Sequence, residues 1–456
     1  MKYTITNKKY FILILGLYFT LSFSIFSQEN VKEAAAKTTI ISDIAQKIDS
    51  GRTAWMLTST AFVLLMIPGL ALFYGGMVRQ KNMLNTILMT LITMGIIGVE
   101  WVLIGYNMAF GDSLRGIVGW TTGGFGLQHI SWDMVSNGVP VLVFVMFQGK
   151  FAIITPALIS GAIVERVKFS SYVVFILFWS ILIYNPLAHM VWSENGWLFN
   201  MGVLDFAGGT VVHISAGFSA LALVLFFLKN RIGYPQYSIK PGSVFQTLLG
   251  AGLLWVGWFG FNAGSAIATS DDFMLRAGLA FTTTQVAASS AALVWIIIEW
   301  IWSGKPSSVG LASGMVAGLV AITPAAGHVS PLAALLIGAL SSIICFLMVL
   351  LKHKFKYDDT LDVFGVHGMG GFAGALATGL FVSVGSDNLG LFIEGGSFTQ
   401  FGLQVIGVFT GVIYAFLGTI VIAYVVDKTM GLRVSKKTET LGLDISEHGE
   451  AALIKR

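Results

Sequence analysis

The chain has 456 residues, of which 55% are hydrophobic and only 11% are charged. Soluble domains carry about 25% charged residues, so the composition excludes a soluble globular protein and places almost all of the chain in lipid. The net charge of +4 is small, and the single cysteine, Cys345, excludes an internal disulfide.

The first 27 residues resemble a secretory signal. Lysines precede an apolar core from Phe11 to Ile25, which is the pattern of a cleavable leader. A retained first membrane helix is the alternative, although the run is short for a span. Residues 28–53 are polar and are predicted to form an extracytoplasmic segment.

About eleven apolar segments follow, each near the ~20 residues that a helix needs to cross a bilayer. They predict an all-α, polytopic membrane protein with a transmembrane domain over residues 54–427 and a polar tail over 428–456. The predicted segments are 54–77, 83–110, 134–161, 171–192, 206–228, 243–267, 274–302, 308–326, 331–351, 361–383 and 401–426.

Lysine and arginine gather on one side of the predicted membrane. Arg79, Arg166, Lys229 and Lys352 lie in connections on the same side as the basic tail, and the opposite side carries few basic residues. Cytoplasmic loops are enriched in Lys and Arg. The N-terminus is therefore predicted outside and the tail inside, in the cell's inner (plasma) membrane.

Two stretches of similar design open the fifth and tenth segments. Each holds Asp, then His, then Gly four residues after the His; they are Asp205, His213 and Gly217, and Asp362, His367 and Gly371. A Thr-Pro pair also recurs five spans apart, at Pro156 in the third predicted span and at Pro324 in the eighth. Five spans is an odd number, so the second copy is inverted. Inverted five-helix repeats place a substrate site near the midplane, at their interface.

His213 and His367 are the first candidates for a functional site. A two-fold axis in the membrane plane would bring the imidazoles together, one donating a proton and the other accepting it. Histidine titrates near neutrality and can relay protons. The alternative is two unrelated core histidines bonded to backbone carbonyls. A metal site is less favoured, because no Cys, Glu or third His is positioned to complete it.

Aromatic side chains line up at helical spacing. Trp258, Phe261 and Ser265 share one helix face, as do Phe147 and Phe151. An aromatic face binds a small cation through its quadrupole, for ~2 kcal/mol or more when desolvated. The alternative is an aromatic core with an interfacial belt.

Trp192 and Asp205 flank the connection before the fifth segment, on the outer side. Asp205 can cap the free N–H groups of the next helical turn and can add negative potential that draws cations inward. Capping alone is at least as well supported as contact with a substrate.

At these residues the chain resembles the ammonium transporters of the Amt/Mep/Rh family, in particular the bacterial Amt branch. The resemblance runs from about residue 49 to 452 and its motifs are highly specific. They are Pro68-Gly-Leu-Ala-Leu-Phe-Tyr-Gly-Gly-Met77, Phe151-Ala-Ile-Ile-Thr-Pro-Ala, Ala188-His-Met-Val-Trp192, Asp205-Phe-Ala-Gly-Gly-Thr-Val-Val-His213, Gly257-Trp-Phe-Gly-Phe-Asn-Ala-Gly-Ser265 and Asp362-Val-Phe-Gly-Val-His367.

The resemblance implies a pore in each subunit. An outer site that recruits ammonium is expected at Phe151, Trp192 and Ser265. Phe147 and Phe151 are expected at the pore mouth, and Phe151 with Phe261 as the gate below it. His213 and His367 match the twin histidines of the pore, Trp258 a residue of its wall, and Asp205 the aspartate that supports recruitment.

The resemblance also implies partners. It implies a homotrimer of eleven-helix subunits that carries ammonium, ammonia and methylammonium, with no cofactor and no nucleic-acid partner. The tail stretch Gly442-Leu-Asp444-Ile-Ser-Glu-His448-Gly-Glu450 matches the family. In that family the tail packs under neighbouring subunits and helps to set activity, and PII signal proteins dock on the cytoplasmic face.

The chain departs from the family pattern at three places. Lys150 stands where an uncharged residue is expected; because a cation in the pore would repel ammonium, its side chain is predicted to point towards a carboxylate or the outer interface. Thr283-Thr284 stands where many relatives carry Asn-Thr, and little functional consequence follows from this difference. His328 is predicted to be a surface residue and not a third pore histidine.

The predicted function is transport of ammonium that is deprotonated at the outer site and crosses as ammonia, with or without separate proton transfer. One alternative is an ammonium sensor that signals through its tail. Another is a sodium-coupled amine carrier with alternating access. An enzyme is not predicted, because no nucleophile–base pair or metal cluster stands out.

Overall fold

A computed structural model of the chain describes residues 47–236, 240–268 and 272–452. The described residues from Asp49 onwards form one compact unit. The predicted leader, residues 1–27, and most of the segment 28–53 lie outside the described residues, so both stay predictions.

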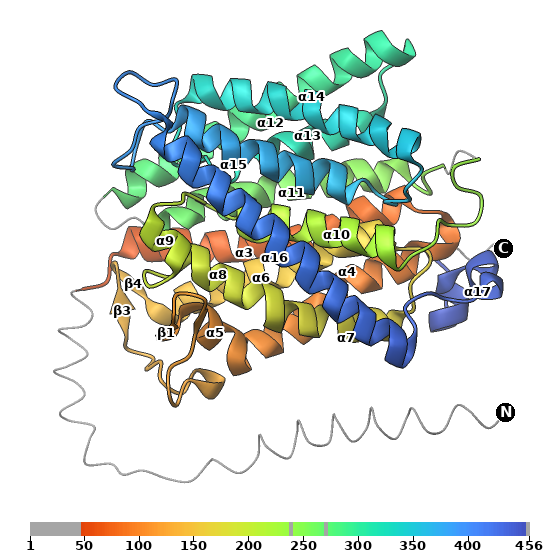
Figure 1. The fold of residues 1–456 in the computed structure, drawn as a ribbon, viewed down its shortest axis with the longest axis horizontal. Helices are drawn as coiled ribbons and strands as arrows, with labels where there is room; N and C mark the ends of the chain where they lie inside the picture. The colour runs from red at the N-terminus through yellow and green to blue at the C-terminus, as the bar shows by residue number, and fades with distance from the viewer. Residues whose placement is uncertain (1–46, 237–239, 269–271, 453–456) are drawn as a thin grey trace. The chain divides into compact units, whose positions relative to one another are not determined.

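Helices make up most of the regular structure in the described residues (Figure 1). They are α3 (Ser50–Met77), α4 (Met83–Glu100), α5 (Tyr106–Phe110), α6 (Val141–Ile163), α7 (Phe169–Trp179), α8 (Asn185–Trp192), α9 (Trp197–Met201), α10 (Ser215–Phe226), α11 (Val244–Gly264), α12 (Phe273–Ser303), α13 (Ser308–Ile322), α14 (Pro331–Phe355), α15 (Met369–Phe381), α16 (Phe398–Met430) and α17 (Lys436–Leu441).

Four π-helical turns join or begin several of these helices. The turns are Trp101–Gly105 between α4 and α5, Ser180–Tyr184 between α7 and α8, Gly209–Ile214 before α10, and Phe364–Gly368 before α15. A π-helical turn is a rare local widening that is often found at functional sites. Two of the four contain the candidate histidines.

Two small antiparallel hairpins lie between α5 and α6. Strand β1 (Ser113–Leu114) pairs with β2 (Val118–Gly119), and β3 (Val135–Ser136) pairs with β4 (Val139–Pro140). The predicted start of the third span at residue 134 is therefore wrong, because the hairpin β3–β4 occupies that stretch and α6 begins after Pro140. The turn of that hairpin is Asn137-Gly138, with both φ angles positive, which is a strong hairpin signal.

The described residues contain nine helical runs that are long and apolar enough to cross a membrane, and a shorter apolar helix, α13. A helix satisfies its own backbone hydrogen bonds, as a segment in lipid must. The all-α, polytopic class predicted from the sequence is thus confirmed. The count of eleven spans and the placement of the two termini stay predictions.

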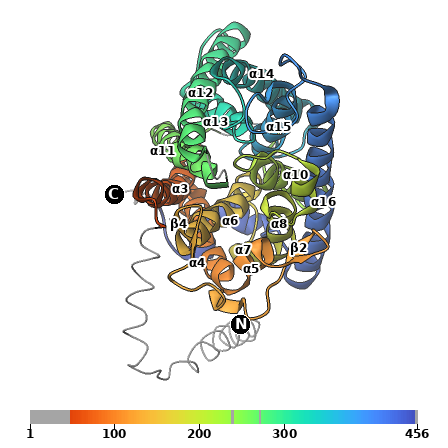
Figure 2. The same ribbon diagram turned by 90° about the vertical axis from the view of Figure 1, so that its left-hand side faces the viewer.

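The helices of Asp49–Arg456 pack in a layered bundle (Figure 2). Helix α3 runs against α11, helices α12, α13 and α14 pack on one another, and α16 covers α10 and α15. Helix α6 contacts α3, α4 and α10. A common interior is therefore surrounded by α6, by α11 and by the two turns that carry the histidines.

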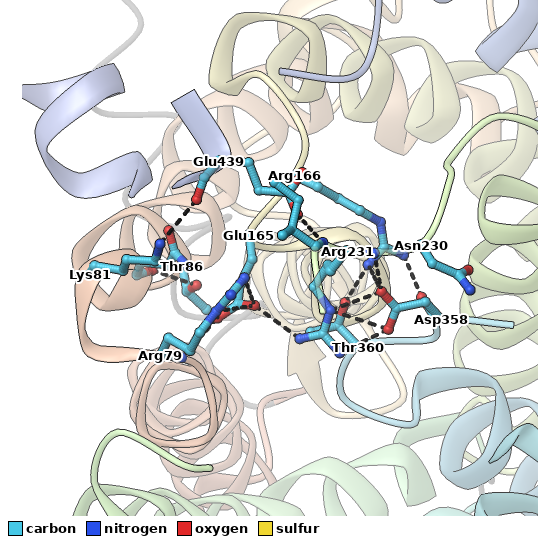
Figure 3. Close-up of polar contacts among 12 residues, drawn as sticks. Arg79, Lys81, Thr86, Glu165, Arg166, Asn230, Arg231, Asp358, Thr360 and Glu439 are labelled. Carbon is cyan, nitrogen blue, oxygen red and sulfur yellow. Dashed lines mark hydrogen bonds and ion pairs between the residues drawn. The ribbon is translucent and has the colours of Figure 1, made fainter. Parts of the chain in front are cut away.

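Charged side chains join the helix ends at the side predicted to be cytoplasmic (Figure 3). Arg231 binds Asp358 at 2.8 Å and Glu165 at 3.0 Å. Arg166 binds Asp358 at 3.0 Å, and Arg79 binds Glu165 at 2.8 Å. The guanidinium groups of Arg166 and Arg231 outweigh burial and hold the pKa of Asp358 at about 2. Buried charges at this interface are thus paired, as their desolvation requires.

The tail packs on its own chain. Asp444 accepts hydrogen bonds from the backbone N–H groups of Leu84 and Asn85 at 3.1 and 2.8 Å, at the start of α4. Glu439 accepts from the backbone N–H of Ile232 at 2.6 Å, and His448 bonds Asn85 at 2.9 Å. The tail therefore supplies a side-chain cap that α4 lacks at its own N-cap residue.

Candidate functional site

A buried aspartate starts the turn that carries His213. The two oxygens of Asp205 accept hydrogen bonds from four successive backbone N–H groups, those of Gly208 to Val211, at 2.5 to 3.0 Å. These N–H groups are the free donors of a helix start, where the helix dipole also favours an anion. The capping role foreseen for Asp205 is thus present in the structure. It fixes the turn on which His213 lies.

Asp359 starts the turn that carries His367 in a similar way. Its oxygens accept hydrogen bonds from the backbone N–H groups of Val363 at 3.1 Å and Phe364 at 2.8 Å. Asp359 is separated from His367 by the same number of residues that separate Asp205 from His213. The two halves of the site are therefore built alike, each on a buried carboxylate.

The sequence comparison that paired Asp362 with Asp205 is wrong in register. Asp362 lies at a turn of positive φ and forms an ion pair with Lys352. Its side chain is 29% exposed, whereas Asp359 is buried. Equal spacing between aspartate and histidine selects Asp359 rather than the nearer Asp362.

The glycine four residues after each histidine faces the other repeat. A Cβ atom on Gly217 would lie 2.2 Å from the backbone of Gly368, and a Cβ on Gly371 would lie 2.9 Å from the carbonyl oxygen of Gly209 and the Cβ of His213. Contacts this short leave no room for a side chain. The two repeats therefore touch through backbone, which explains why the pattern carries glycine at both positions.

The two histidines lie side by side. Their Nδ1 atoms are 3.3 Å apart, and their ring centroids are 5.3 Å apart with an angle of 22° between the planes. Both are buried. One Nδ1 must donate and the other accept, so the pair shares one proton at this contact. The Nε2 atom of His213 is also buried and has no partner among the residues that the structure describes.

A column of aromatic rings leads to the histidines. The Trp192 ring meets Phe151 edge to face at 5.9 Å, and Phe151 stacks on Phe261 at 4.2 Å. Phe261 lies 6.2 Å from the ring of His213, and Trp258 stacks on that ring at 5.4 Å. The stacked Phe151 and Phe261 close the column above the histidines.

The remaining candidates surround this column. Phe147 meets Phe151 at 4.9 Å and packs where a side chain on Gly264 would be. Ser265 lies one helical turn beyond Phe261 and donates its hydroxyl to the carbonyl of that residue at 2.8 Å. The aromatic and histidine candidates are thus linked by ring contacts, Asp205 joins them through its hydrogen bond with Trp192, and Ser265 follows from its place after α11.

Hydrogen bonds hold the two tryptophans in position. The indole N–H of Trp192 donates to the carbonyl of Asp205 at 2.8 Å, so the capping loop also anchors this ring. The indole N–H of Trp258 donates to the hydroxyl of Thr323 at 2.8 Å. Thr323 was missed from the sequence, although its place before Pro324 in the repeated Thr-Pro pair was a signal.

A narrow apolar cavity of about 10 Å³ lies below the stacked phenylalanines. Phe261, Trp258, His213 and His367 line it, together with Met66, Leu70, Phe73, Ile154, Leu158, Val212, Leu254 and Val316. This volume is near the least that one water-sized molecule occupies. The cavity can thus admit one molecule of about that size, and the two histidines are the polar side chains in its lining.

Lys150 does not line this cavity. It is half-buried on α6 and forms no ion pair within the described part of the chain. The prediction that its side chain points away from the pore stays a prediction, and a carboxylate partner is not present among those residues.

The prediction that His328 is a surface residue is wrong. His328 is buried, its Nδ1 lies 3.2 Å from the guanidinium of Arg276 and 3.0 Å from the carbonyl of Val384, and its ring meets Phe206 at 5.3 Å. Burial lowers the pKa of His328 to about 4. Segments far apart in the chain cover it, so local sequence gave no sign of burial. It lies outside the lining of the cavity.

Comparisons with known proteins point to one family. The model of the Ammonium Transporter Family matches residues 54–453. An ammonium transporter of Aquifex aeolicus is 46% identical over 413 residues, which cover 89% of this chain and 94% of that protein. An ammonium transporter of Bacillus subtilis is 43% identical over 412 residues, which cover 88% of this chain and 98% of that protein.

Solved structures agree with this result. The crystal structure of Saccharomyces cerevisiae Mep2 superimposes with a TM-score of 0.79 at 32% identity, covering 87% of this chain and 90% of that one. Since the family match spans most of the chain and the fold is shared with Mep2, this chain belongs to the ammonium transporter family.

Proposed function

We propose that this chain recruits ammonium at an outer aromatic site, removes a proton and conducts ammonia through the pore lined by His213 and His367. Membership of the ammonium transporter family supports ammonium as the substrate. The main observation in support of this mechanism is a continuous series of ring contacts. The series runs from Trp192 through the stacked Phe151 and Phe261 to the paired imidazoles.

Recruitment takes place where Phe151 and Trp192 meet edge to face. Their ring faces attract a cation, and the hydroxyl of Ser265 can accept one N–H bond from ammonium. The carboxylate of Asp205 does not contact the cation in this account. The backbone carbonyl of Asp205 accepts the indole N–H of Trp192, and the carboxylate adds negative potential at the mouth of the pore.

The gate requires a ring movement. Phe151 and Phe261 stack at 4.2 Å, which leaves no space for a molecule between them. A rotation of either side chain would open a route to the cavity below. The cavity below holds about one water-sized molecule, so a gate of this kind admits one small molecule at a time.

The apolar lining of the cavity determines whether ammonium or neutral ammonia crosses. Ammonium is close in size to potassium, yet the cavity has no ring of carbonyls or carboxylates to replace the water of a bare cation. Burying that charge would cost several kcal/mol or more. Neutral ammonia avoids the cost, and it can bond to the free Nε2 of His213. The histidine pair also offers a path by which the proton can follow separately.

The wider setting of the protein follows from the same family. We propose a homotrimer in the cell's inner (plasma) membrane, with three separate pores and no enzymatic activity. The tail over 428–456 is then cytoplasmic, where a PII signal protein can reach it. Cross-linking of the purified protein in detergent tests the trimer.

The proposed function is tested by uptake of labelled methylammonium in a host that lacks its own uptake system. Wild type should restore uptake without sodium. Ser265→Leu removes an acceptor and narrows the outer site, so its KM should rise by about tenfold, the cost of about one lost hydrogen bond. His213→Ala should lower the maximal rate of uptake instead, because it removes a polar side chain from the lining of the cavity below the gate.

A matched control is Ser289→Leu, since Ser289 is exposed on α12 and is not among the residues that line the cavity. It should behave as wild type. Uptake that requires sodium, or that is unchanged in both site variants, would contradict the proposal.

A further inference from the structure

Glu100 is a buried carboxyl group that the pore does not use. It is 2% exposed and lies at the end of α4, inside the apolar run Gln80–Phe110. The end of that run is about 15 Å away along the helix axis. An ionisable group at such depth is expensive unless it is paired, and it marks a functional site by default.

The partners of Glu100 are neutral. Asn185 Nδ2 donates to one carboxyl oxygen at 2.7 Å, and the Ser180 hydroxyl lies 3.2 Å from the other. No Lys, Arg or His forms an ion pair with Glu100 among the residues that the structure describes. Asp205 differs, because it accepts four N–H groups at a helix start, whereas Glu100 lies within a continuous helical run.

The local backbone makes room for the carboxyl group. A Cβ atom on Gly105 would lie 3.0 Å from both oxygens of Glu100, so this glycine leaves the space that they fill. The π-helical turn Trp101–Gly105 follows Glu100, and the turn Ser180–Tyr184 supplies Ser180 and leads into Asn185. Two rare turns therefore meet at this one carboxyl group.

One polar atom in the cluster has no partner. Asn185 is fully buried, and its Oδ1 lacks a hydrogen bond within the described chain, although the Nδ2 of the same amide binds Glu100. A protonated carboxyl group fits these surroundings. It still accepts from Asn185 Nδ2, and its O–H can be accepted by the Ser180 oxygen or the free amide oxygen.

We propose that Glu100 is a proton-binding site in the membrane core, separate from the histidine pair, and that its carboxyl group keeps its proton at neutral pH. Loss of the proton in alkaline solution puts an unpaired charge where Ser180 and Asn185 cannot balance it. The ligand of this site is thus a proton rather than a metal or an organic molecule.

The position of Glu100 connects this site to the outer part of the pore. The next residue, Trp101, donates its indole N–H to the carbonyl of Val145 on α6 at 2.9 Å. Helix α6 carries Phe151, and Asn185 begins α8, which ends at Trp192. Ionisation of Glu100 therefore loosens the junction of the two helices that bear the recruiting rings. This consequence, unlike the proton site itself, rests on the proposed function.

Other titratable groups near this junction have their own contacts. Tyr106 of α5 and Tyr184 meet Trp101 at 5.9 and 6.5 Å, and His129 stacks on Tyr106 at 6.3 Å. His189 of α8 bonds the carbonyl of Ala109. Lys150 is on α6, and α3 carries no titratable residue between Arg52 and Tyr74. The experiment must separate Glu100 from these groups.

Glu100→Gln is the direct test, because glutamine has the same shape and cannot ionise. In the purified full-length protein at pH 7, the infrared C=O band of a protonated carboxyl group should be present in wild type and weaker in Glu100→Gln.

A buried carboxyl that stays protonated in the fold but ionises on unfolding makes unfolding easier as the pH rises. The Tm of Glu100→Gln minus that of wild type should therefore grow from pH 5 to pH 9.

Transport gives a further readout. At pH 7 the KM for methylammonium should agree within about twofold between wild type and Glu100→Gln, and at pH 9 the KM of wild type should be higher by about threefold or more. Glu394→Gln is the control, because Glu394 is exposed in a loop; it should leave the infrared band and the Tm difference unchanged.

Three results would overturn the proposal. An unchanged infrared band means that Glu100 is already ionised. A Glu100→Gln variant that is less stable than wild type at every pH, or that fails to fold while Glu394→Gln folds, means that the charge is needed. Stabilisation of wild type alone by sodium or potassium chloride means that a cation occupies the site.

Discussion

Gly217→Ala should abolish most methylammonium uptake although it leaves every pore-lining side chain in place. The added Cβ would lie 2.2 Å from the backbone of Gly368, the residue next to His367. Backbone cannot rotate aside as a side chain can, so the two repeats must separate. We expect a loss of about 3 kcal/mol or more in stability and at least about a tenfold fall in uptake, because the contact between the imidazoles depends on this approach.

The matched control is Gly402→Ala. Gly402 lies in α16, and a Cβ there would meet nothing within 4 Å. Alanine is favoured over glycine within a helix by about 0.5–1 kcal/mol, so this variant should melt at or slightly above the wild-type temperature and transport normally. Thermal unfolding in detergent and uptake in cells measure the two effects. Normal transport by Gly217→Ala would show that the repeats do not touch as described.

Asp359→Asn should impair transport more than Asp362→Asn does. Asp359 uses both oxygens to hold the N–H groups that begin the turn of His367, and asparagine keeps only one acceptor. A hydrogen bond to a charged group contributes about 1.5–3 kcal/mol. We therefore expect a loss of about 2 kcal/mol in stability and a fall of about tenfold in the maximal uptake rate.

Asp362→Asn is the control for that comparison. Its side chain is partly exposed, and asparagine keeps an oxygen for Lys352, so the loss of stability should be smaller than that of Asp359→Asn. Asp205→Asn should resemble Asp359→Asn, since both carboxylates start histidine-bearing turns. If Asp362→Asn had the larger effect on the maximal rate, the pairing of Asp205 with Asp359 would be wrong.

The membrane fold could be predicted from hydropathy, because lipid requires long apolar helices. The positions of His213 and His367 also followed from their repeated surroundings. The start of α6 was missed, since the apolar residues of the hairpin β3–β4 resemble the start of a span. The turn pair Asn137-Gly138 was the signal against that interpretation.

Contacts between distant segments could not be predicted. The burial of His328 depends on Arg276 and Val384, which lie far from it in the chain. Asp359 was overlooked because Asp362 stands closer to His367. Glu100 was also overlooked, although a single acidic residue within an apolar run is itself a signal.

Only a cation that is able to lose a proton should pass the apolar cavity. Purified protein in proteoliposomes, supplied with equal concentrations of radiolabelled methylammonium or rubidium, tests it most directly, because rubidium resembles potassium and ammonium in size but carries no proton. We predict saturable methylammonium uptake and no rubidium uptake above that of empty liposomes. Rubidium uptake at a comparable rate would show that the charge crosses intact and that ammonium need not lose its proton.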